Sequence, residues 1–166
     1  LTLDFVTTAL ELPKISGLKS DLHFSSITTD SRKIEKGALF VAIVGDQFDG
    51  HDFISKAVEL GASGILATRT KIPPHLPKEV AVFAVNDSLD AYRMLAHAWR
   101  MEFKIPVIGV AGSVGKTSTK ELLAALLRGK FSNVLYTQGS QNGYVGIPMT
   151  LLQMNSSTDA AVIEIG

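Results

Sequence analysis

The chain has no cysteine among its 166 residues, which excludes disulfides, thiolate nucleophiles and cysteine-ligated zinc. It also lacks an apolar run of the roughly 18 residues that a membrane span needs. The N-terminus has no basic segment followed by an apolar core, so it does not read as a signal peptide. Sixteen Lys and Arg balance sixteen Asp and Glu, so the basic excess typical of nonspecific nucleic-acid binding is missing. We therefore expect a cytoplasmic protein without nucleic-acid or membrane partners.

Apolar residues make up 46% of the chain and charged residues 19%, which is typical of a folded globular protein. Short apolar runs alternate with segments of helical periodicity. We expect strands over residues 38–43, 64–68, 80–85, 107–111, 134–135 and 161–165, and helices over residues 3–10, 53–60, 88–101 and 117–127. Near-continuous apolar strands separated by helices predict an α/β fold, with parallel sheets covered on both faces.

A second strand–turn–helix unit begins after Pro106, so we place a domain boundary near Asn86. This divides the chain into a small α/β domain over residues 1–85 and the first part of a second domain over residues 86–166. A phosphate-loop domain normally has about five parallel strands or more. Too few residues follow Thr117 to supply them, and the first residue is Leu rather than Met. We therefore expect the chain to be the opening part of a longer protein.

The strongest chemical signal is a glycine-rich turn between a strand and a helix, over residues 109–117. Such a turn exposes backbone N–H groups to an anion, and the positive end of the helix dipole lies at the same place. The candidate nucleotide-binding residues are Gly112, Ser113, Val114, Gly115, Lys116, Thr117 and Ser118. Lys116 would reach the terminal phosphates, and the Thr117 hydroxyl would hold Mg²⁺. The longer G-x-x-x-x-G-K-[ST] pattern is not met, because Val110 stands at its first glycine.

Two charged features near this turn have simpler interpretations. Glu164 ends an apolar strand, where a carboxylate beside a phosphate loop would hold Mg²⁺ directly or through water. A solvated strand end explains the same residue equally well. Lys120 and Glu121, on the helix after the loop, are interpreted as a solvated helix face.

Six blocks of sequence carry a resemblance to one family. They are ITTDSR at 27–32, KGALFVA at 36–42, DGHDF at 49–53, GSVGKT at 112–117, GIPMTLL at 146–152 and VIEIG at 162–166. In this order they resemble the N-terminal domain and the start of the central ATPase domain of the Mur ligases. The resemblance is greatest to the branch of the family that adds D-alanyl-D-alanine to a UDP-muramoyl-tripeptide in peptidoglycan precursor synthesis. One block departs from the family pattern, because Gly143 and Tyr144 follow Asn142 where an Asn and an acidic residue are usual.

The resemblance implies a three-domain, ATP- and magnesium-dependent ligase that works through an acyl phosphate. Its first domain would bind the uridine diphosphate end of the substrate, with Ser31, Arg32, Asp46, Gln47, Asp49, Gly50 and His51 as candidate contacts. In the second domain it implies catalytic roles for Lys116 and Glu164, magnesium ligation by Thr117 and Glu164, and a substrate or phosphate contact by Asn142. The partners implied are small molecules, UDP-muramoyl-tripeptide and D-alanyl-D-alanine. The sequence does not give the oligomeric state, and we expect the longer protein to be monomeric.

Three alternatives stay open. The first is a sister Mur ligase that adds a diamino acid, against which the stretch from Asn142 to Leu152 speaks. The second is a complete phosphate-loop kinase or GTPase-like switch, which would have no affinity for a uridine sugar nucleotide. The third is a sugar-nucleotide-binding module without turnover. We expect the 166 residues alone to behave like the third, because the dipeptide-binding and adenine-binding parts of such a ligase would lie beyond Gly166.

Overall fold

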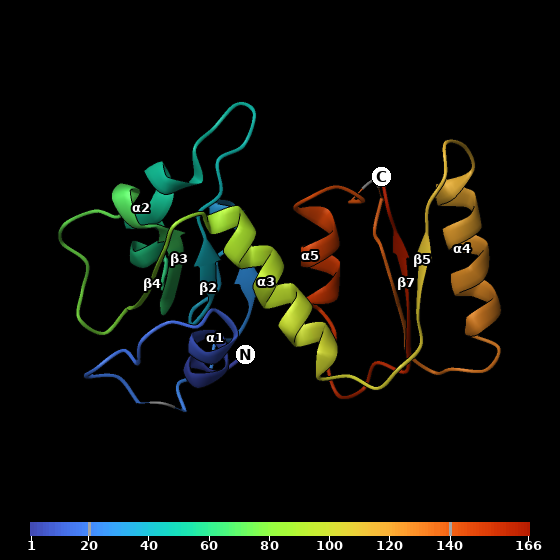
Figure 1. Cartoon of the computed structure of the whole chain (residues 1–166), viewed down its shortest axis with the longest axis horizontal. Helices are drawn as coiled ribbons and strands as arrows, with labels where there is room; N and C mark the ends of the chain where they lie inside the picture. The colour runs from blue at the N-terminus through green and yellow to red at the C-terminus, as the bar shows by residue number, and fades with distance from the viewer. Residues whose placement is uncertain (20, 140) are drawn as a thin grey trace. The chain divides into compact units, whose positions relative to one another are not determined.

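The computed structural model describes residues 1–19, 21–139 and 141–166. The chain divides into two compact units, Leu1–Leu95 and Ala96–Gly166. Each unit is built on its own parallel sheet, so the predicted α/β class is confirmed (Figure 1). The units divide within helix α3 (Ser88–Met101), which starts two residues after Asn86. In the part of the chain that the structure describes, no helix has the length and apolar character to cross a membrane.

The first unit contains a four-stranded sheet whose spatial order follows the chain. Its strands are β1 (Ile27–Thr28), β2 (Leu39–Val41), β3 (Gly64–Thr68) and β4 (Ala81–Val85), each parallel to its neighbours. Parallel pairing places the carboxyl ends of all four strands at one edge of the sheet. The loops that leave this edge carry all the residues predicted to contact a uridine nucleotide.

Helices cover both faces of this sheet. Helix α2 (Ile54–Glu59) lies on one face, with α1 (Leu3–Ala9) and the start of α3 on the other (Figure 1). Phe40, Ile54 and Ile65 form the centre of the core under α2 and have no exposed surface. Because side chains alternate along a strand, Leu39 and Val41 point to the opposite face, where they are equally buried. The continuous apolar runs of the sequence thus reflect strands buried on both sides.

The helix ends follow from short polar and glycine signals. The Thr2 hydroxyl accepts a hydrogen bond from the Phe5 N–H at 3.1 Å and caps α1. Asp87 caps α3, since its Oδ1 accepts from the Leu89 and Asp90 N–H groups at 2.8 and 2.9 Å. Gly61, with a φ of +102°, follows the last turn of α2 and ends it.

The second unit has a three-stranded parallel sheet in the order β5-β7-β6. Its strands are β5 (Val107–Val110), β6 (Val134–Tyr136) and β7 (Ala160–Glu164). All five residues of β7 are buried, because this central strand is covered on both faces. Helix α4 (Lys116–Leu127) packs on one face and α5 (Gly146–Leu151) on the other (Figure 1).

Two apolar clusters hold this sheet between its helices. Val162 packs with the fully buried Ala124 of α4, whereas Ala161 and Ile163 pack with Met154 on the other face. Trp99 packs against the second cluster, and its indole N–H donates to the Met154 carbonyl at 2.9 Å. The sheet therefore presents the C-terminal ends of β5 and β7 side by side, directly below the glycine-rich turn.

Four short helices are absent from the prediction. Three are 3-10 turns that follow strands of the first unit, η1 (Ser31–Lys33), η2 (Gly50–Phe53) and η3 (Arg69–Lys71). The fourth is α5, which has six residues and no side-chain cap. Its Pro148 is tolerated because the amides of the first helical turn need no partner within the helix.

Candidate functional site

The glycine-rich turn joins β5 to α4 and leaves the first turn of that helix without a side-chain cap. Gly112 and Gly115 have φ angles of +145° and +77°, which residues with a side chain rarely adopt. Gly115 is also the N-cap of α4, so the amides of Lys116 and the residues after it are open to an anion. The Lys116 ammonium donates to the Gly112 carbonyl at 2.9 Å and thus lies across the turn. This is the geometry of an anion-binding loop.

Glu164, the last residue of β7, is the centre of a polar cluster at the carboxyl edge of the second sheet. Only 1% of the residue is exposed. Its Oε1 accepts hydrogen bonds from the Thr117 hydroxyl at 3.2 Å and from the Asn142 amide at 2.8 Å. Its backbone N–H donates to the Thr137 hydroxyl at 2.9 Å. Two segments that are far apart in the sequence, the start of α4 and the stretch from Thr137 to Asn142, therefore hold Glu164 in place, so it is not a solvated strand end.

A pocket of about 350 Å³ opens over this cluster. It is lined by Gly115, Lys116, Thr117, Ser118, Asn142 and Glu164. The sequence predicted every one of these residues for the nucleotide or substrate site, and the structure brings them together. Gly112, Ser113 and Val114 form the exposed turn that precedes them, with Val114 at 90% exposure.

The prediction for Lys120 is wrong. Lys120 has no exposed surface, whereas a solvated helix face would leave it open to water. Its Nζ donates to the Thr137 carbonyl at 2.8 Å and lies 3.0 Å from Glu121 Oε1 and 3.8 Å from Glu164 Oε2. Glu121 itself is half exposed, as expected. The missed signal is position, because Lys120 lies one helical turn before the buried Ala124 and so on the inner face of α4.

The residues around Glu164 fit a magnesium ion. Glu164 Oε2 is buried and has no hydrogen-bond partner, and a carboxylate oxygen left free in this way is a ligand that hard cations prefer. The Thr117 hydroxyl, 3.2 Å from Oε1, would be a second oxygen ligand. Within residues 1–19, 21–139 and 141–166, no three His, Asp or Glu side chains gather into a metal site. Phosphate oxygens and water would therefore complete the coordination, as Mg²⁺ commonly requires.

The predicted uridine-nucleotide residues follow two neighbouring strands of the first unit. Ser31 and Arg32 lie in η1, which follows β1, and Asp46 and Gln47 lie in the loop that follows β2. Arg32, Asp46 and Gln47 are exposed. Because β1 and β2 are paired and parallel, both segments leave the same edge of the sheet. Open parallel sheets bind ligands at this edge.

Arg32 is held by a two-pronged ion pair. Its Nε and Nη2 both donate to the Asp30 carboxylate at 2.9 Å, and this hydrogen bonding lowers the pKa of Asp30 to about 2. The pair also orders η1, because Asp30 Oδ1 accepts from the Arg32 backbone N–H at 3.0 Å. The Arg32 side chain is nevertheless 87% exposed. It is thus oriented, charged and accessible.

The remaining residues predicted for this pocket are bonded within the protein itself. Asp49 Oδ1 pairs with His51 Nδ1 at 2.6 Å, and its Oδ2 accepts from Lys71 at 2.5 Å. The Thr68 N–H donates to His51 Nε2 at 3.0 Å, so the proton of this buried ring is on Nδ1. Hydrogen bonding to Lys71 is the main cause that lowers the pKa of Asp49. Sequence reasoning missed Lys71, and no local signal could have found it, since it lies 22 residues from Asp49.

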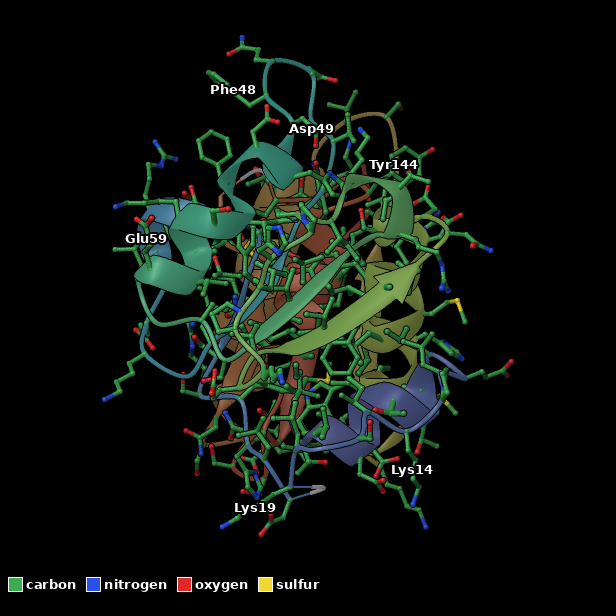
Figure 2. All side chains as sticks on the ribbon, turned by 90° about the vertical axis from the view of Figure 1, so that its left-hand side faces the viewer. Lys14, Lys19, Phe48, Asp49, Glu59 and Tyr144 are labelled. Carbon is green, nitrogen blue, oxygen red and sulfur yellow. The ribbon has the colours of Figure 1, made fainter. Side chains whose placement is uncertain are left out.

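These bonds fix the loop between β2 and α2. Gly50 contributes by its lack of a side chain, because a Cβ there would lie 2.7 Å from the Ile43 backbone nitrogen and oxygen. The tip of the loop remains in solvent, with Phe48 70% exposed (Figure 2). The structure thus gives Asp49, Gly50 and His51 the role of shaping the loop. As substrate contacts they stay predictions, like Ser31, Arg32, Asp46 and Gln47.

Comparison with known families assigns both units. The profile described as "Mur ligase family, catalytic domain" matches residues 23–100, and that described as "Mur ligase middle domain" matches residues 110–166. The chain belongs to the Mur ligase family. The two matches follow one another in the order that the sequence blocks predicted, so the predicted family is confirmed.

Named relatives point to one branch of this family. The chain is 42% identical to the UDP-N-acetylmuramoyl-tripeptide–D-alanyl-D-alanine ligase of Synechocystis sp., over 99% of this chain and 36% of the relative. It is 40% identical to the ligase of the same name from Escherichia coli, over 89% of this chain and 31% of the relative. The chain thus spans about a third of the length of these curated relatives.

Solved structures of Mur ligases share the fold. A crystal structure of MurF from Acinetobacter baumannii superposes with a TM-score of 0.84 at 30% identity, covering 99% of this chain and 35% of that protein. MurF from Thermotoga maritima, solved in complex with ADP, superposes with a TM-score of 0.73 at 36% identity. That match covers 88% of this chain and 33% of the Thermotoga protein.

Proposed function

We propose that these residues are the N-terminal part of an ATP-dependent ligase that adds D-alanyl-D-alanine to UDP-N-acetylmuramoyl-tripeptide in the cytoplasm. One observation carries the proposal. Lys116, Thr117, Asn142 and Glu164 line a single pocket, in a chain whose curated relatives bear the name of that activity. The proposal concerns the longer enzyme, because the chain spans about a third of those relatives.

In this proposal the second unit binds ATP. The first-turn amides of α4 and the Lys116 ammonium would hold the β- and γ-phosphates, replacing the bond that Lys116 makes to Gly112. Thr117 and Glu164 would hold Mg²⁺ through their side-chain oxygens. When bound there, the ion neutralises phosphate charge and makes the γ-phosphorus a better electrophile. The Thermotoga relative was solved in complex with ADP, which supports nucleotide binding by the longer enzyme.

The chemistry needs charge neutralisation more than a protein nucleophile. The tripeptide carboxylate attacks the γ-phosphorus, the bond to the bridging oxygen breaks, and ADP leaves with formation of an acyl phosphate. The D-alanyl-D-alanine amine then attacks the acyl carbon, phosphate leaves, and the amine loses a proton as the amide forms. Lys116 would stabilise the charge that develops on the phosphoryl oxygens in the first step. Asn142, fixed on Glu164, would hold either the carboxylate or a phosphate oxygen in line.

The first unit would bind the uridine diphosphate end of the substrate at the carboxyl edge of its sheet. Arg32 suits a diphosphate, because its guanidinium is charged, accessible and held by Asp30. Ser31 and the loop residues Asp46 and Gln47 would supply hydrogen bonds. Asp49, Gly50 and His51 would fix the loop that presents them.

Calorimetric titration with ATP and Mg²⁺ tests the nucleotide site. The wild-type chain should bind saturably. Lys116→Ala should bind at least tenfold more weakly, because charge-assisted hydrogen bonds contribute about 1.5–3 kcal/mol each. Lys104→Ala removes an exposed lysine of the same unit that lies outside the pocket, and it should bind like the wild type. Equal affinities of Lys116→Ala and the wild type would refute the site.

The same preparation tests whether these residues catalyse ligation without the rest of the longer enzyme. Incubated with UDP-N-acetylmuramoyl-tripeptide, D-alanyl-D-alanine and ATP, these 166 residues should form no product. ATP-dependent product formation by this chain alone would show that the two units suffice for ligation, against the proposal.

A further inference from the structure

Lys120 is the one lysine among the described residues that has no exposed surface. Burial of an ammonium group is costly unless charges and hydrogen-bond acceptors compensate for it. A residue on the first two turns of a surface helix could point its charge to water at no cost. The position of Lys120 on the inner face of α4 therefore calls for a role beyond packing.

The surroundings of Lys120 connect it to the segment that leaves β6. Its Nζ donates to the Thr137 carbonyl at 2.8 Å and reaches the Gly139 carbonyl at 3.5 Å. The hydroxyl of the same Thr137 accepts from the Glu164 backbone N–H. Asn142, a few residues further along, donates its amide to Glu164 Oε1. Lys120 thus anchors a segment that contacts Glu164 at two points.

The charge of Lys120 also faces Glu164 directly. Nζ lies 3.8 Å from Glu164 Oε2, which is an ion-pair distance but too long for a hydrogen bond. The carboxylate therefore has a buried counter-charge, while Oε2 remains without a donor. A carboxylate oxygen that has a nearby counter-charge but accepts no hydrogen bond can still bind a cation. The exposed Glu121 carboxylate lies 3.0 Å from Nζ and forms a second ion pair with the lysine.

We propose that Lys120 is a positioning residue of the magnesium–nucleotide site, which keeps the Glu164 carboxylate buried and aimed into the pocket. The inference rests on the proposed function, because it concerns the same site. Lys120 does not touch the nucleotide in this account. It acts through Glu164 and through the carbonyls of Thr137 and Gly139.

The test compares ATP affinity in Mg²⁺ with ATP affinity in EDTA, by calorimetry on the full chain. Lys120→Met keeps the volume of the side chain but removes its charge and its donors. The affinity gained from magnesium should fall at least tenfold, whereas affinity in EDTA should change less than threefold, because the amides of the loop are untouched. Lys120→Gln keeps a donor for the Thr137 carbonyl, so it serves as a second variant in case Lys120→Met does not fold. It should also lose the affinity gained from magnesium. Glu121→Gln is the matched control and should keep it.

Several outcomes would overturn the inference. Equal losses with and without magnesium would mean that Lys120 only supports the fold. A larger gain in affinity from magnesium in Lys120→Met would mean that the lysine merely repels the ion. If Glu121→Gln lost as much of this gain as Lys120→Met, the effect would not be specific to Lys120. Failure of the proposed function looks different, since the wild-type chain would then gain no affinity from magnesium.

Discussion

Gly146 offers the sharpest test of the packing behind the candidate site. It is buried at the start of α5, where an added Cβ would lie 2.4 Å from the backbone carbonyl carbon and oxygen of Gln141. Gly143, three residues earlier, has no atom within 4 Å of the same added carbon. Neither glycine has a positive φ, so the two alanine variants differ in steric clash alone.

The size of the effect follows from this geometry. Overpacking that forces the backbone to move costs about 1–3 kcal/mol. The upper half of that range applies to Gly146→Ala, because the clash is with backbone rather than with a flexible side chain. Gly143→Ala restricts only the unfolded chain and should stabilise by about 0.4–1 kcal/mol. The unfolded-chain gain applies to both Gly→Ala changes and cancels, so the two variants should differ by the clash alone, about 2–3 kcal/mol in free energy of unfolding.

Tryptophan fluorescence isolates this difference. The chain has one tryptophan, Trp99, which lies in the second unit and packs edge-on against Phe103 at a centroid distance of 5.3 Å. Urea unfolding followed by its emission therefore reports on the unit that contains Gly146. With a slope of about 2 kcal/mol per molar urea, the midpoints of the two variants should differ by about 1 M. Coincident midpoints would refute the packing argument.

Three further predictions concern the first unit and helix α3. Asp87→Ala removes the cap of α3 and should cost about 1 kcal/mol in urea unfolding followed by circular dichroism, whereas no loss would show that the cap is dispensable. Asp49→Asn removes the ion pair with Lys71 and should destabilise the chain at pH 7. Because folding depresses the pKa of Asp49, the stability that its charge contributes is complete above the ordinary pKa near 4 and is lost as the pH falls. In thermal unfolding, the difference in stability between the wild type and the variant should therefore shrink below pH 4. A difference that stays constant with pH would contradict this. Arg32→Ala should leave the melting temperature within error, because exposed ion pairs contribute about 0–1 kcal/mol, yet it should weaken binding of a uridine diphosphate ligand; unchanged binding would remove Arg32 from the pocket.

The sequence predicted the elements that rest on local signals. The strand Gly64–Thr68 matches its prediction residue for residue, because a continuous apolar run bounded by turn residues has few other structures to adopt. The strand order of the second sheet does not follow from such local signals. β7 lies between β5 and β6, and that arrangement depends on contacts between segments that are far apart in the chain. No local pattern records it.

The candidate site divides in the same way. Lys116 and Thr117 follow from the glycine-rich turn, and Glu164 from its place at a strand end. Lys120 was missed because lysine is normally solvated, and only the burial of its helix face shows otherwise. The bonding of His51 to Asp49 and Thr68 likewise depends on the pairing of strands that the sequence does not encode locally.

Calorimetric titration of the chain with UDP-N-acetylmuramoyl-tripeptide tests the central claim most directly, with UMP and Mg–ATP as comparison ligands. The predicted uridine contacts all lie in the first unit, in segments that leave the carboxyl edge of its four-stranded sheet. The account predicts saturable binding of the muramoyl nucleotide, and weaker binding by Arg32→Ala. A chain that is folded by circular dichroism and binds Mg–ATP but no uridine ligand would contradict it, and would favour a phosphate-loop protein of another function.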